Sequence, residues 1–378
     1  MKLLVFAHTP PPVHGQSLMV TTLVEGLRNT PDLELFHVNP RLSRDAADIG
    51  RVRPGKLFTL LAACARALWL RARHGPMVFY YVPAPGKRGA LYRDWLVMLA
   101  CRPFFYGLVL HWHAAGLTEW LEANATAFER FLTRALLGRA ALAIVLSDSL
   151  RADADGLRAQ RVAVVPNGFV TPTAPQTRTP AASCRVLFLG LCSEAKGLFS
   201  AASAILEANR RTAGAASQPA FVLTVAGAFA DDATAARFGE LARQYPVVFN
   251  YAGVVAGAEK TRLFAECHIV CLPSRYPAEG QPLVLLEALA YDRPIVATRW
   301  RGIPDIVTPA VGLLVSPGDD AALAAALLEL CAHPPPAGNC RARFLTHYTV
   351  EQHLRALAAA LRTIEQADAP RRQRPLLT

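Results

Sequence analysis

Two glutamates eight positions apart, Glu279 and Glu287, are the strongest candidates in this sequence for residues of a binding or catalytic site. From Leu283 onward apolar residues recur at helical spacing, and Pro282 is predicted to be the first helical residue because its missing N–H costs nothing there. A helix N-terminus attracts an anion, and carboxylates accept hydrogen bonds from hydroxyl groups. The pattern fits a diphosphate with a sugar hydroxyl pair on either side. The alternative is an ordinary helix with two solvated glutamates.

A second suitable position is Lys196, in the loop Gly190–Gly197 between a predicted strand and a predicted helix. A lysine at a helix start is unfavourable for the helix dipole unless an anion is bound there. The loop lacks the Gly-Lys-Ser/Thr sequence of a P-loop. Lys196 is therefore predicted to bind phosphate in another way.

Two histidines lie at the end of a strand predicted over Phe104–Trp112. Ligands of open parallel sheets bind beyond the carboxyl ends of the strands, so a histidine there can contact a sugar hydroxyl or stabilise charge. His113, which precedes small residues, is the first candidate, and His111 is the second. The alternative is a strand-end histidine with a purely structural partner.

The turn after the first predicted strand, Lys2–His8, places Gly15 just before a helix that runs to about Arg28. Glycine lets the backbone approach a ligand closely. Gln16 or Ser17 could cap this helix or face a phosphate. Ordinary turn chemistry would explain the same residues.

These motifs resemble the signature of retaining glycosyltransferases of family four, the group 1 glycosyl transferases of the two-domain GT-B fold. In that signature a Pro-Ser pair, here Pro273-Ser274, precedes two glutamates separated by seven residues, and a Leu- and Ala-rich helix follows. The resemblance covers nearly the whole chain and is most specific in its second half. It implies a site for a nucleotide diphosphate sugar.

The resemblance also implies a role for each matched residue. His113, Lys196 and Glu279 are expected to be catalytic. Glu287 is expected to hold ribose hydroxyls, Glu279 sugar hydroxyls, and Lys196 the leaving diphosphate. The residues expected to bind the donor are Gly15, Gln16, Ser193, Lys196, Val254, Glu279, Gly280, Gln281, Pro282, Leu283 and Glu287.

The sequence departs from the family pattern at two places. Gln281-Pro282 replaces the aromatic residue and glycine that often follow Glu-Gly, which affects recognition of the donor sugar. Leu191 occupies the position of an arginine that usually helps to hold the diphosphate. Arg275 is the candidate to replace that arginine.

The elements that would position these residues form two α/β series. Residues 1–172 are predicted to form an acceptor-side Rossmann-like domain, and 184–345 a nucleotide-sugar-binding domain. Residues 173–183 form a Pro-rich linker, 346–366 a helix that crosses back to the first domain, and 367–378 a flexible tail. The fold class is α/β, of the GT-B type, with two doubly wound sheets facing a central cleft. A single helix is expected over Thr118–Leu137.

Composition favours a globular protein of about two domains, because 52% of residues are hydrophobic and 18% are charged. No apolar run reaches the roughly 18 residues that a spanning helix needs, and Met1–Ala7 is too short for a signal peptide. The expected location is the cytoplasm, with peripheral association to the inner membrane face.

The net charge of +11 is concentrated between Arg41 and Arg102, where 12 basic and 3 acidic residues lie. Within it, Arg51–His74 combines basic and apolar residues with Trp69, as in helices that lie on an anionic bilayer. The alternative is a packed helix with solvated ends. Nucleic acid is not an expected partner, because the basic residues lie in apolar helices without interleaved aromatic residues.

Two patterns that imitate metal sites are rejected, and neither a metal nor another cofactor is expected. Asp153-Ala154-Asp155 lies in a helix rather than just after a strand, where a metal-binding Asp-x-Asp clamp belongs. Cys267, His268 and Cys271 lie in or beside a strand, where alternation would point them to different faces.

The resulting hypothesis is a metal-independent, retaining hexosyltransferase. It would move a sugar from a UDP-sugar to a glycan or lipid-linked acceptor in cell-surface polysaccharide synthesis. One alternative is a nucleotide-sugar epimerase of the same two-domain shape. Another is a catalytically degenerate partner protein that binds the nucleotide sugar without turnover, as the leucine at position 191 could suggest.

Overall fold

The computed structural model describes residues 1–28, 30–42, 54–172, 182–212 and 220–368. The chain divides into two compact units, one comprising Met1–Gly168 with Val350–Thr378 and the other Phe169–Thr349. Residues 173–181 of the predicted linker and the tail beyond residue 368 lie outside the described residues, as do Arg51 and Arg53 of the predicted basic segment.

The first unit is built on a parallel sheet whose central strands are buried on both faces. β3 and β5 read Val-Phe-Tyr-Tyr and Leu-Ala-Ile-Val, and every residue in them is buried, as expected for a sheet covered by helices on both sides. In spatial order the strands are β2 (Glu34–Val38), β1 (Lys2–Phe6), β3 (Val78–Tyr81), β4 (Gly107–His111), β5 (Leu142–Val145) and β6 (Val162–Val164). The helices are α1 (Gly15–Leu27), α2 (Pro54–His74), α3 (Arg88–Cys101), α4 (Leu117–Asn124), α5 (Ala127–Leu137), α6 (Ala152–Gly156) and α14 (Val350–Asp368).

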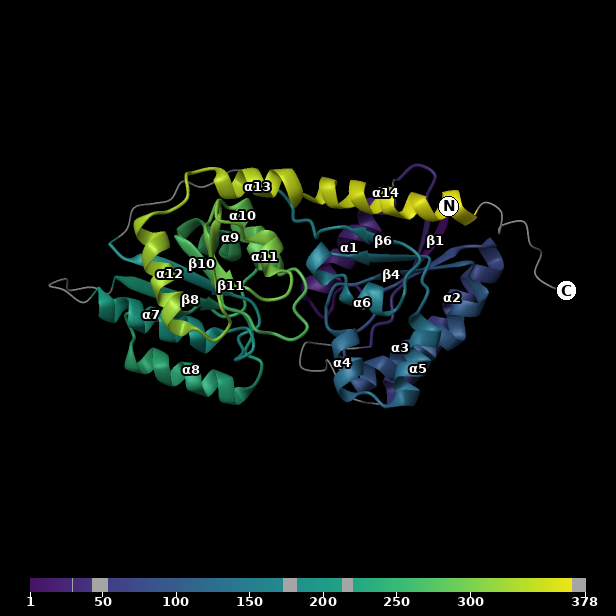
Figure 1. The fold of residues 1–378 in the computed structure, drawn as a ribbon, viewed down its shortest axis with the longest axis horizontal. Helices are drawn as coiled ribbons and strands as arrows, with labels where there is room; N and C mark the ends of the chain where they lie inside the picture. Colours follow the sequence, from purple (N-terminus) through teal and green to yellow (C-terminus); the bar gives the residue numbers. More distant parts are fainter. Residues whose placement is uncertain (29, 43–53, 173–181, 213–219, 369–378) are drawn as a thin grey trace. The chain divides into compact units, whose positions relative to one another are not determined.

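Helices cover both faces of this sheet. The apolar sides of α2, α3, α4, α5 and α6 share one core cluster, and those of α1 and α14 share another with the opposite strand faces. Figure 1 shows α14 lying along α1. The last helix therefore completes the core of the first unit, although the whole second unit precedes it in the chain. It contributes the buried residues Leu357, Leu361 and Ile364.

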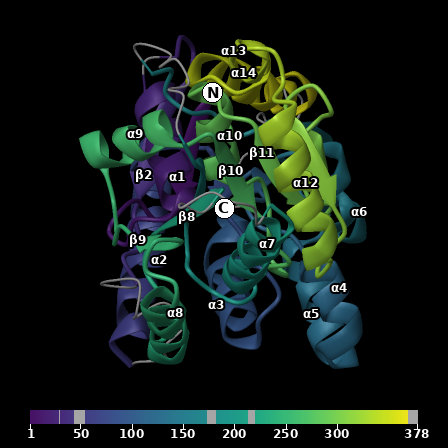
Figure 2. The same ribbon diagram turned by 90° about the vertical axis from the view of Figure 1, so that its left-hand side faces the viewer.

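The second unit repeats this plan. Its parallel strands, in spatial order, are β12 (Gly312–Val315), β11 (Ile295–Thr298), β10 (Ile269–Leu272), β7 (Cys184–Leu189), β8 (Phe221–Ala226) and β9 (Phe249–Tyr251). Its helices are α7 (Leu198–Arg211), α8 (Asp232–Gln244), α9 (Gly257–Glu266), α10 (Leu283–Ala290), α11 (Ile303–Ile306), α12 (Asp320–Ala332) and α13 (Asn339–His347). Figure 2 shows α7 and α12 side by side, packed on the same face of the sheet.

The predicted α/β class with two doubly wound sheets is confirmed, but one predicted helix is wrong. The segment expected as one helix over Thr118–Leu137 forms α4 and α5. Thr126 caps α5 by accepting a hydrogen bond from the Glu129 N–H, and the Glu129 carboxylate accepts one from the Thr126 N–H. This capping box starts a new helix, so the chain breaks at Ala125.

Each sheet contains a point where the strand order reverses. In the second sheet the chain runs from β7 outward to β8 and β9, then returns to β10 on the other side of β7 and continues to β11 and β12. In the first sheet the reversal lies between β1 and β3. The loops after β7 and β10 therefore lie next to each other at the carboxyl edge of this sheet, which is where open α/β sheets bind ligands.

Candidate functional site

The centre of the candidate site is an ion pair between the two loops at the reversal point of the second sheet. The Lys196 ammonium, after β7, donates to both carboxylate oxygens of Glu279, after β10, at 2.7 and 2.8 Å. Glu279 is 4% exposed and the Lys196 side chain 19%, so the pair lies at the boundary between core and solvent. The Lys196 nitrogen also lies 4.9 Å from the centre of the Tyr276 ring. Sequence reasoning chose both residues but did not pair them.

Hydrogen bonds from neighbouring residues fix both members of this pair. The Ser274 hydroxyl donates to Oε2 of Glu279 at 2.5 Å and accepts from the Tyr276 N–H at 3.2 Å. On the other loop, the Ser193 hydroxyl accepts from the Lys196 N–H at 3.2 Å. The predicted donor residue Ser193 therefore shapes the turn that presents the lysine.

Gly197 is required where these two loops touch. Its φ is +84°, in the left-handed region, and a Cβ at this position would lie 2.2 Å from the carbonyl oxygen of Pro273. A side chain would therefore be strained by its own backbone and would push away the loop that carries Ser274. The glycine allows the lysine loop and the glutamate loop to pack directly against each other.

The start of α10 differs by one residue from the prediction. Pro282 is the N-cap residue with extended backbone, ψ 119°, and the helix begins at Leu283. A cap residue lies outside the helical dihedral region, and proline tolerates this conformation well. Gly280, Gln281 and Pro282 are buried and Leu283 is half-buried. The predicted donor-binding segment Gly280–Leu283 therefore has no fully exposed side chain, and its backbone groups are the ones available to a ligand.

Glu287 is buried inside α10 with an incomplete set of partners. It is 3% exposed, and its Oε1 accepts from the Lys260 ammonium of α9 at 2.7 Å. Its Oε2 is buried and has no hydrogen-bond partner among the described residues. Burial raises the pKa of this carboxyl, and Lys260 opposes the rise. With Glu279 buried as well, the alternative of two solvated glutamates is wrong.

The side chains of the remaining predicted positions in this unit are exposed. Val254 follows the edge strand β9 and is 75% exposed. Leu191, where the family has arginine, is exposed. The guanidinium of Arg275, the suggested replacement, donates to Glu194 at 3.0 Å. Glu194 also pairs with Arg237, so Arg275 belongs to an exposed charge network at the edge of the lysine loop.

In the first unit, five histidines gather at the carboxyl edge of the sheet. We refer to His8, His14, His111, His113 and His353 as the histidine cluster. Nε2 atoms of His8 and His14 lie 2.8 Å apart, the rings of His111 and His113 are 4.0 Å apart between centres, and those of His111 and His353 are 6.5 Å apart. Sequence reasoning named only the two strand-end members, because His353 joins from α14 at the other end of the chain.

The two strand-end histidines differ in their partners. His111 is fully buried and its Nδ1 is hydrogen-bonded to the Tyr80 hydroxyl. His113 is half-buried, and neither of its ring nitrogens forms a hydrogen bond of ordinary geometry within the described residues. Burial lowers the pKa of His113 to about 3, with the nearby Asn167 side chain acting in the opposite direction. His113 is therefore a neutral imidazole at neutral pH with the Asn167 side chain nearby, whereas His111 has a structural partner in Tyr80.

The other predicted residues of this unit lie in the first turn of α1. His14 is the N-cap of α1, so the prediction of Gln16 or Ser17 as the cap is wrong, and Ser17 instead completes a capping box with His14. Gly15 is the first helical residue and is exposed, and Gln16 is half-buried. The histidine cap thus joins the predicted ligand turn to the histidine cluster.

The two patterns rejected as metal sites have structural partners. The Asp153 carboxylate accepts from the N–H groups of Gly116 and Thr118 at 2.9 and 2.7 Å, which anchors the start of α4. The His268 Nδ1 accepts from the Arg185 N–H at 2.9 Å, which joins β7 to the segment before β10.

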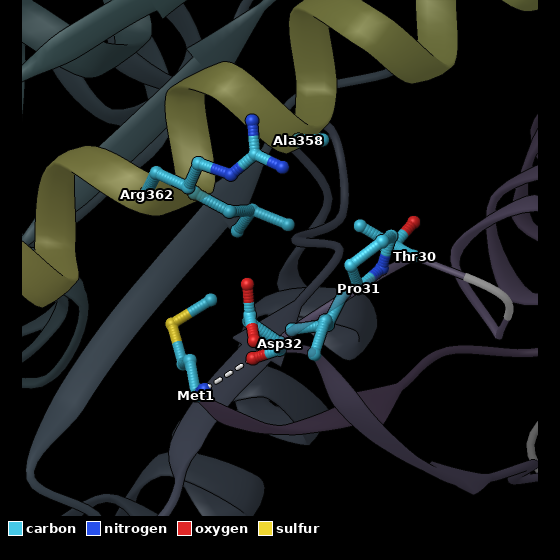
Figure 3. Close-up of a pocket in the computed structure, with 8 residues that line it drawn as sticks. Met1, Thr30, Pro31, Asp32, Ala358 and Arg362 are labelled. Carbon is cyan, nitrogen blue, oxygen red and sulfur yellow. Dashed lines mark hydrogen bonds between the residues drawn. The ribbon is translucent and has the colours of Figure 1, made fainter.

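A hollow of about 260 Å³ lies elsewhere in the first unit, between α14 and the turn before β2. Figure 3 shows Met1, Asp32 and Arg362 around it. Met1 and Asp32 precede β1 and β2, so the hollow lies at the amino ends of these strands, whereas parallel sheets bind ligands beyond their carboxyl ends. We therefore do not place the substrate site there.

Comparison with known protein families identifies the second unit. Residues 183–333 match the sequence profile of the family described as Glycosyl transferases group 1. The second unit carries a group 1 glycosyl transferase domain. The reversal point, the lysine loop and both glutamates of this glycosyl transferase domain lie within the matched residues. Comparison with curated protein sequences gives no match.

Solved structures similar to the whole chain share the GT-B fold. Sucrose-phosphate synthase from Thermosynechococcus elongatus is 19% identical, with a TM-score of 0.73 over 97% of this chain and 100% of that chain. HepE from Anabaena in complex with UDP-glucose is 18% identical, with a TM-score of 0.68 over 96% and 99% of the two chains. The lipopolysaccharide outer core galactosyltransferase WaaB is 15% identical, with a TM-score of 0.66 over 96% and 99%. The predicted GT-B fold is confirmed.

The histidine cluster predicts that acid destabilises the first unit. Burial holds the pKa of every member below its usual value, at about 4 for His8 and about 3 for His113. The unfolded chain therefore takes up protons near its own pKa of about 6.5 that the folded unit does not bind. The free energy of unfolding falls as the pH falls below about 6.5, and this loss levels off below the folded pKa values.

Thermal unfolding followed by circular dichroism between about pH 7 and pH 5 measures this effect, since few carboxyl groups titrate in that window. We expect the Tm to fall, and the fall to be smaller in a His8→Asn, His14→Asn variant. Equal slopes for the variant and the wild type would show that the histidines do not cause it.

Proposed function

We propose that the protein is a retaining glycosyltransferase that moves a hexosyl group from a UDP-sugar to a glycan or lipid-linked acceptor in cell-surface polysaccharide synthesis. The domain match supports a transferase of nucleotide sugars. The observation that carries the proposal is the Lys196–Glu279 ion pair at the reversal point of the second sheet. It supplies a cation for the diphosphate and a carboxylate for the sugar at one place.

The proposed binding step is an exchange of partners at this pair. Lys196 has three N–H donors, and its ammonium donates to both carboxylate oxygens of Glu279. When the diphosphate arrives at the N-terminus of α10, the ammonium and the first free N–H groups of the helix stabilise it. Glu279, held in place by Ser274, then accepts hydrogen bonds from hydroxyls of the transferred sugar. We assign the ribose hydroxyls to the unpartnered oxygen of Glu287.

We further propose that charge on the leaving diphosphate is stabilised by Lys196 and the helix, without a metal ion. No protein nucleophile is assigned, and the acceptor hydroxyl attacks from the face that the leaving group occupies, which retains the anomeric configuration. We assign His113 to a hydroxyl of the sugar, as a neutral donor and acceptor. HepE and WaaB, a UDP-glucose complex and a lipopolysaccharide galactosyltransferase, support the choice of donor and acceptor class.

Thermal shift with a panel of nucleotide sugars tests the donor assignment, followed by transfer assays with and without EDTA. We expect UDP-sugars to raise the Tm more than other nucleotide sugars, and turnover to be unchanged by EDTA. Loss of turnover with EDTA would contradict the metal-independent mechanism. Conversion of the donor without acceptor would indicate the epimerase, and binding without turnover would indicate a partner protein, as the exposed Leu191 could suggest.

A further inference from the structure

The outer face of α2 is apolar where the face of a surface helix is normally polar. Leu57, Phe58, Leu61 and Trp69 are all exposed, Phe58 at 72% and Trp69 at 55%. The opposite face of the same helix packs into the core of the first unit. An ordinary amphipathic helix buries one apolar stripe and exposes a polar one. The packed-helix interpretation explains the inner face of α2 but not its outer face.

Two neighbouring helices continue this apolar surface. α5 exposes Phe128 and Phe131, at 66% and 68%, and α3 exposes Leu99. α3 packs against both α2 and α5, and all three helices contribute side chains to the same core cluster. Figure 1 shows the three helices on the same side of the sheet. Their outer faces therefore point away from the sheet in the same general direction. We call this surface, formed by the outer faces of α2, α3 and α5, the aromatic face.

The exposed charges on the three helices of the aromatic face have one sign. α2 contains four basic residues and no acidic residue. The acidic residues of α3 and α5, Asp94 and Glu129, are buried and paired with arginines. The exposed charges on the three helices are therefore basic, and they include Arg66, Arg73, Arg88 and Arg134. α4, which packs beside α5, exposes Glu119 and Glu122, so the basic excess lies on α2, α3 and α5 themselves. Exposed aromatic residues on helices whose own exposed charges are basic complement an anionic lipid surface.

We propose that the aromatic face docks on the surface of an anionic lipid bilayer, with Phe58, Trp69 and Phe131 inserted at the headgroup level. None of the helices in the described residues has the length and apolar character to cross a membrane. Docking is therefore peripheral, and it presents the first unit to an acceptor carried by a lipid. The lipid-linked acceptor rests on the proposed function, whereas the docking itself rests on the surface alone.

Flotation of the purified protein with vesicles tests this proposal. We expect it to float with vesicles of phosphatidylcholine and phosphatidylglycerol, to stay in solution with phosphatidylcholine alone, and to be released by high salt. A Phe58→Ser, Trp69→Ser, Phe131→Ser variant should lower the bound fraction at least ~10-fold, because the loss of each ring removes apolar area that would be buried in the membrane. An Arg66→Glu, Arg73→Glu variant should also stay in solution.

Two matched controls should float like the wild type. Arg355→Glu changes an exposed arginine of α14, on the opposite face of the first sheet, and Val247→Ser changes an exposed apolar residue of the second unit. Wild-type protein that ignores anionic vesicles, or a serine variant that floats normally, overturns the proposal. So does a dimer seen by size-exclusion chromatography that the serine variant loses, without vesicle binding. Thermal shift with UDP on all variants separates this test from the proposed function, because UDP binding does not depend on the aromatic face.

Discussion

Replacing Lys196 by alanine is expected to lower turnover with a UDP-sugar donor by about 10²–10³-fold. The ammonium stabilises charge that develops on the leaving diphosphate, in a site partly shielded from water. Such an interaction is stronger in the transition state than in the ground state, so kcat should fall more than the affinity for donor. Steady-state kinetics of wild type and variant, with donor and acceptor varied separately, measure this.

Two control variants make the Lys196 result specific. Lys196→Ala also leaves Glu279 without its cation, which could weaken the fold, so the Tm of the variant must be measured. A Lys196→Arg variant keeps the charge and should recover part of the turnover if charge is what matters. Arg275→Ala, which removes an exposed cation paired with Glu194, should cost far less. A Lys196→Ala enzyme that is folded and fully active would exclude the assigned role.

The second large effect is expected at Glu287. Glu287→Gln should weaken UDP binding by about 10–100-fold, because hydrogen bonds to a charged group contribute ~1.5–3 kcal/mol. Its effect on the Tm should be small, for two reasons. The Oε2 atom has no partner to lose, and a carboxyl whose folded pKa is raised costs stability when it is ionised at neutral pH.

Calorimetric titration with UDP and thermal unfolding of the same preparations test this pair of effects. A Lys260→Met variant is the control, because it removes the partner of Oε1 but not the carboxylate. A Glu287→Gln protein that binds UDP normally but unfolds many degrees lower would show that Glu287 is structural.

The sequence was sufficient to locate the candidate site because the residues proposed for it follow from local patterns. A strand, a loop and a helix beginning near Pro282 determine where Glu279 and Glu287 lie relative to α10, and Lys196 follows from its own loop in the same way. The prediction that α10 begins at Pro282 is wrong by one residue, but Glu279 and Glu287 still lie in the predicted loop and helix. The break between α4 and α5 was also readable, from Thr126 and Glu129 three residues apart, and it was missed.

The partners of these residues could not be predicted, because they depend on tertiary contacts between distant segments. Lys196 and Glu279 are 83 residues apart in the sequence, and Lys260 and Glu287 are 27 apart. Such separations are far longer than the spacing between neighbours within one helix or strand, so no local pattern predicts these pairs. His353 joins the histidine cluster only because α14 packs on the first sheet. The sequence predicts only part of the aromatic face. It indicates the basic and apolar segment, but the exposure of the aromatic side chains depends on how the helices pack.

A crystal structure with UDP, prepared in the presence of a chelator, tests the central claim most directly. The account predicts that the diphosphate rests at the N-terminus of α10 within hydrogen-bond distance of the Lys196 ammonium, with the ribose hydroxyls on Glu287. UDP bound at another edge of the sheet, or bound only when a divalent cation is added, would contradict it.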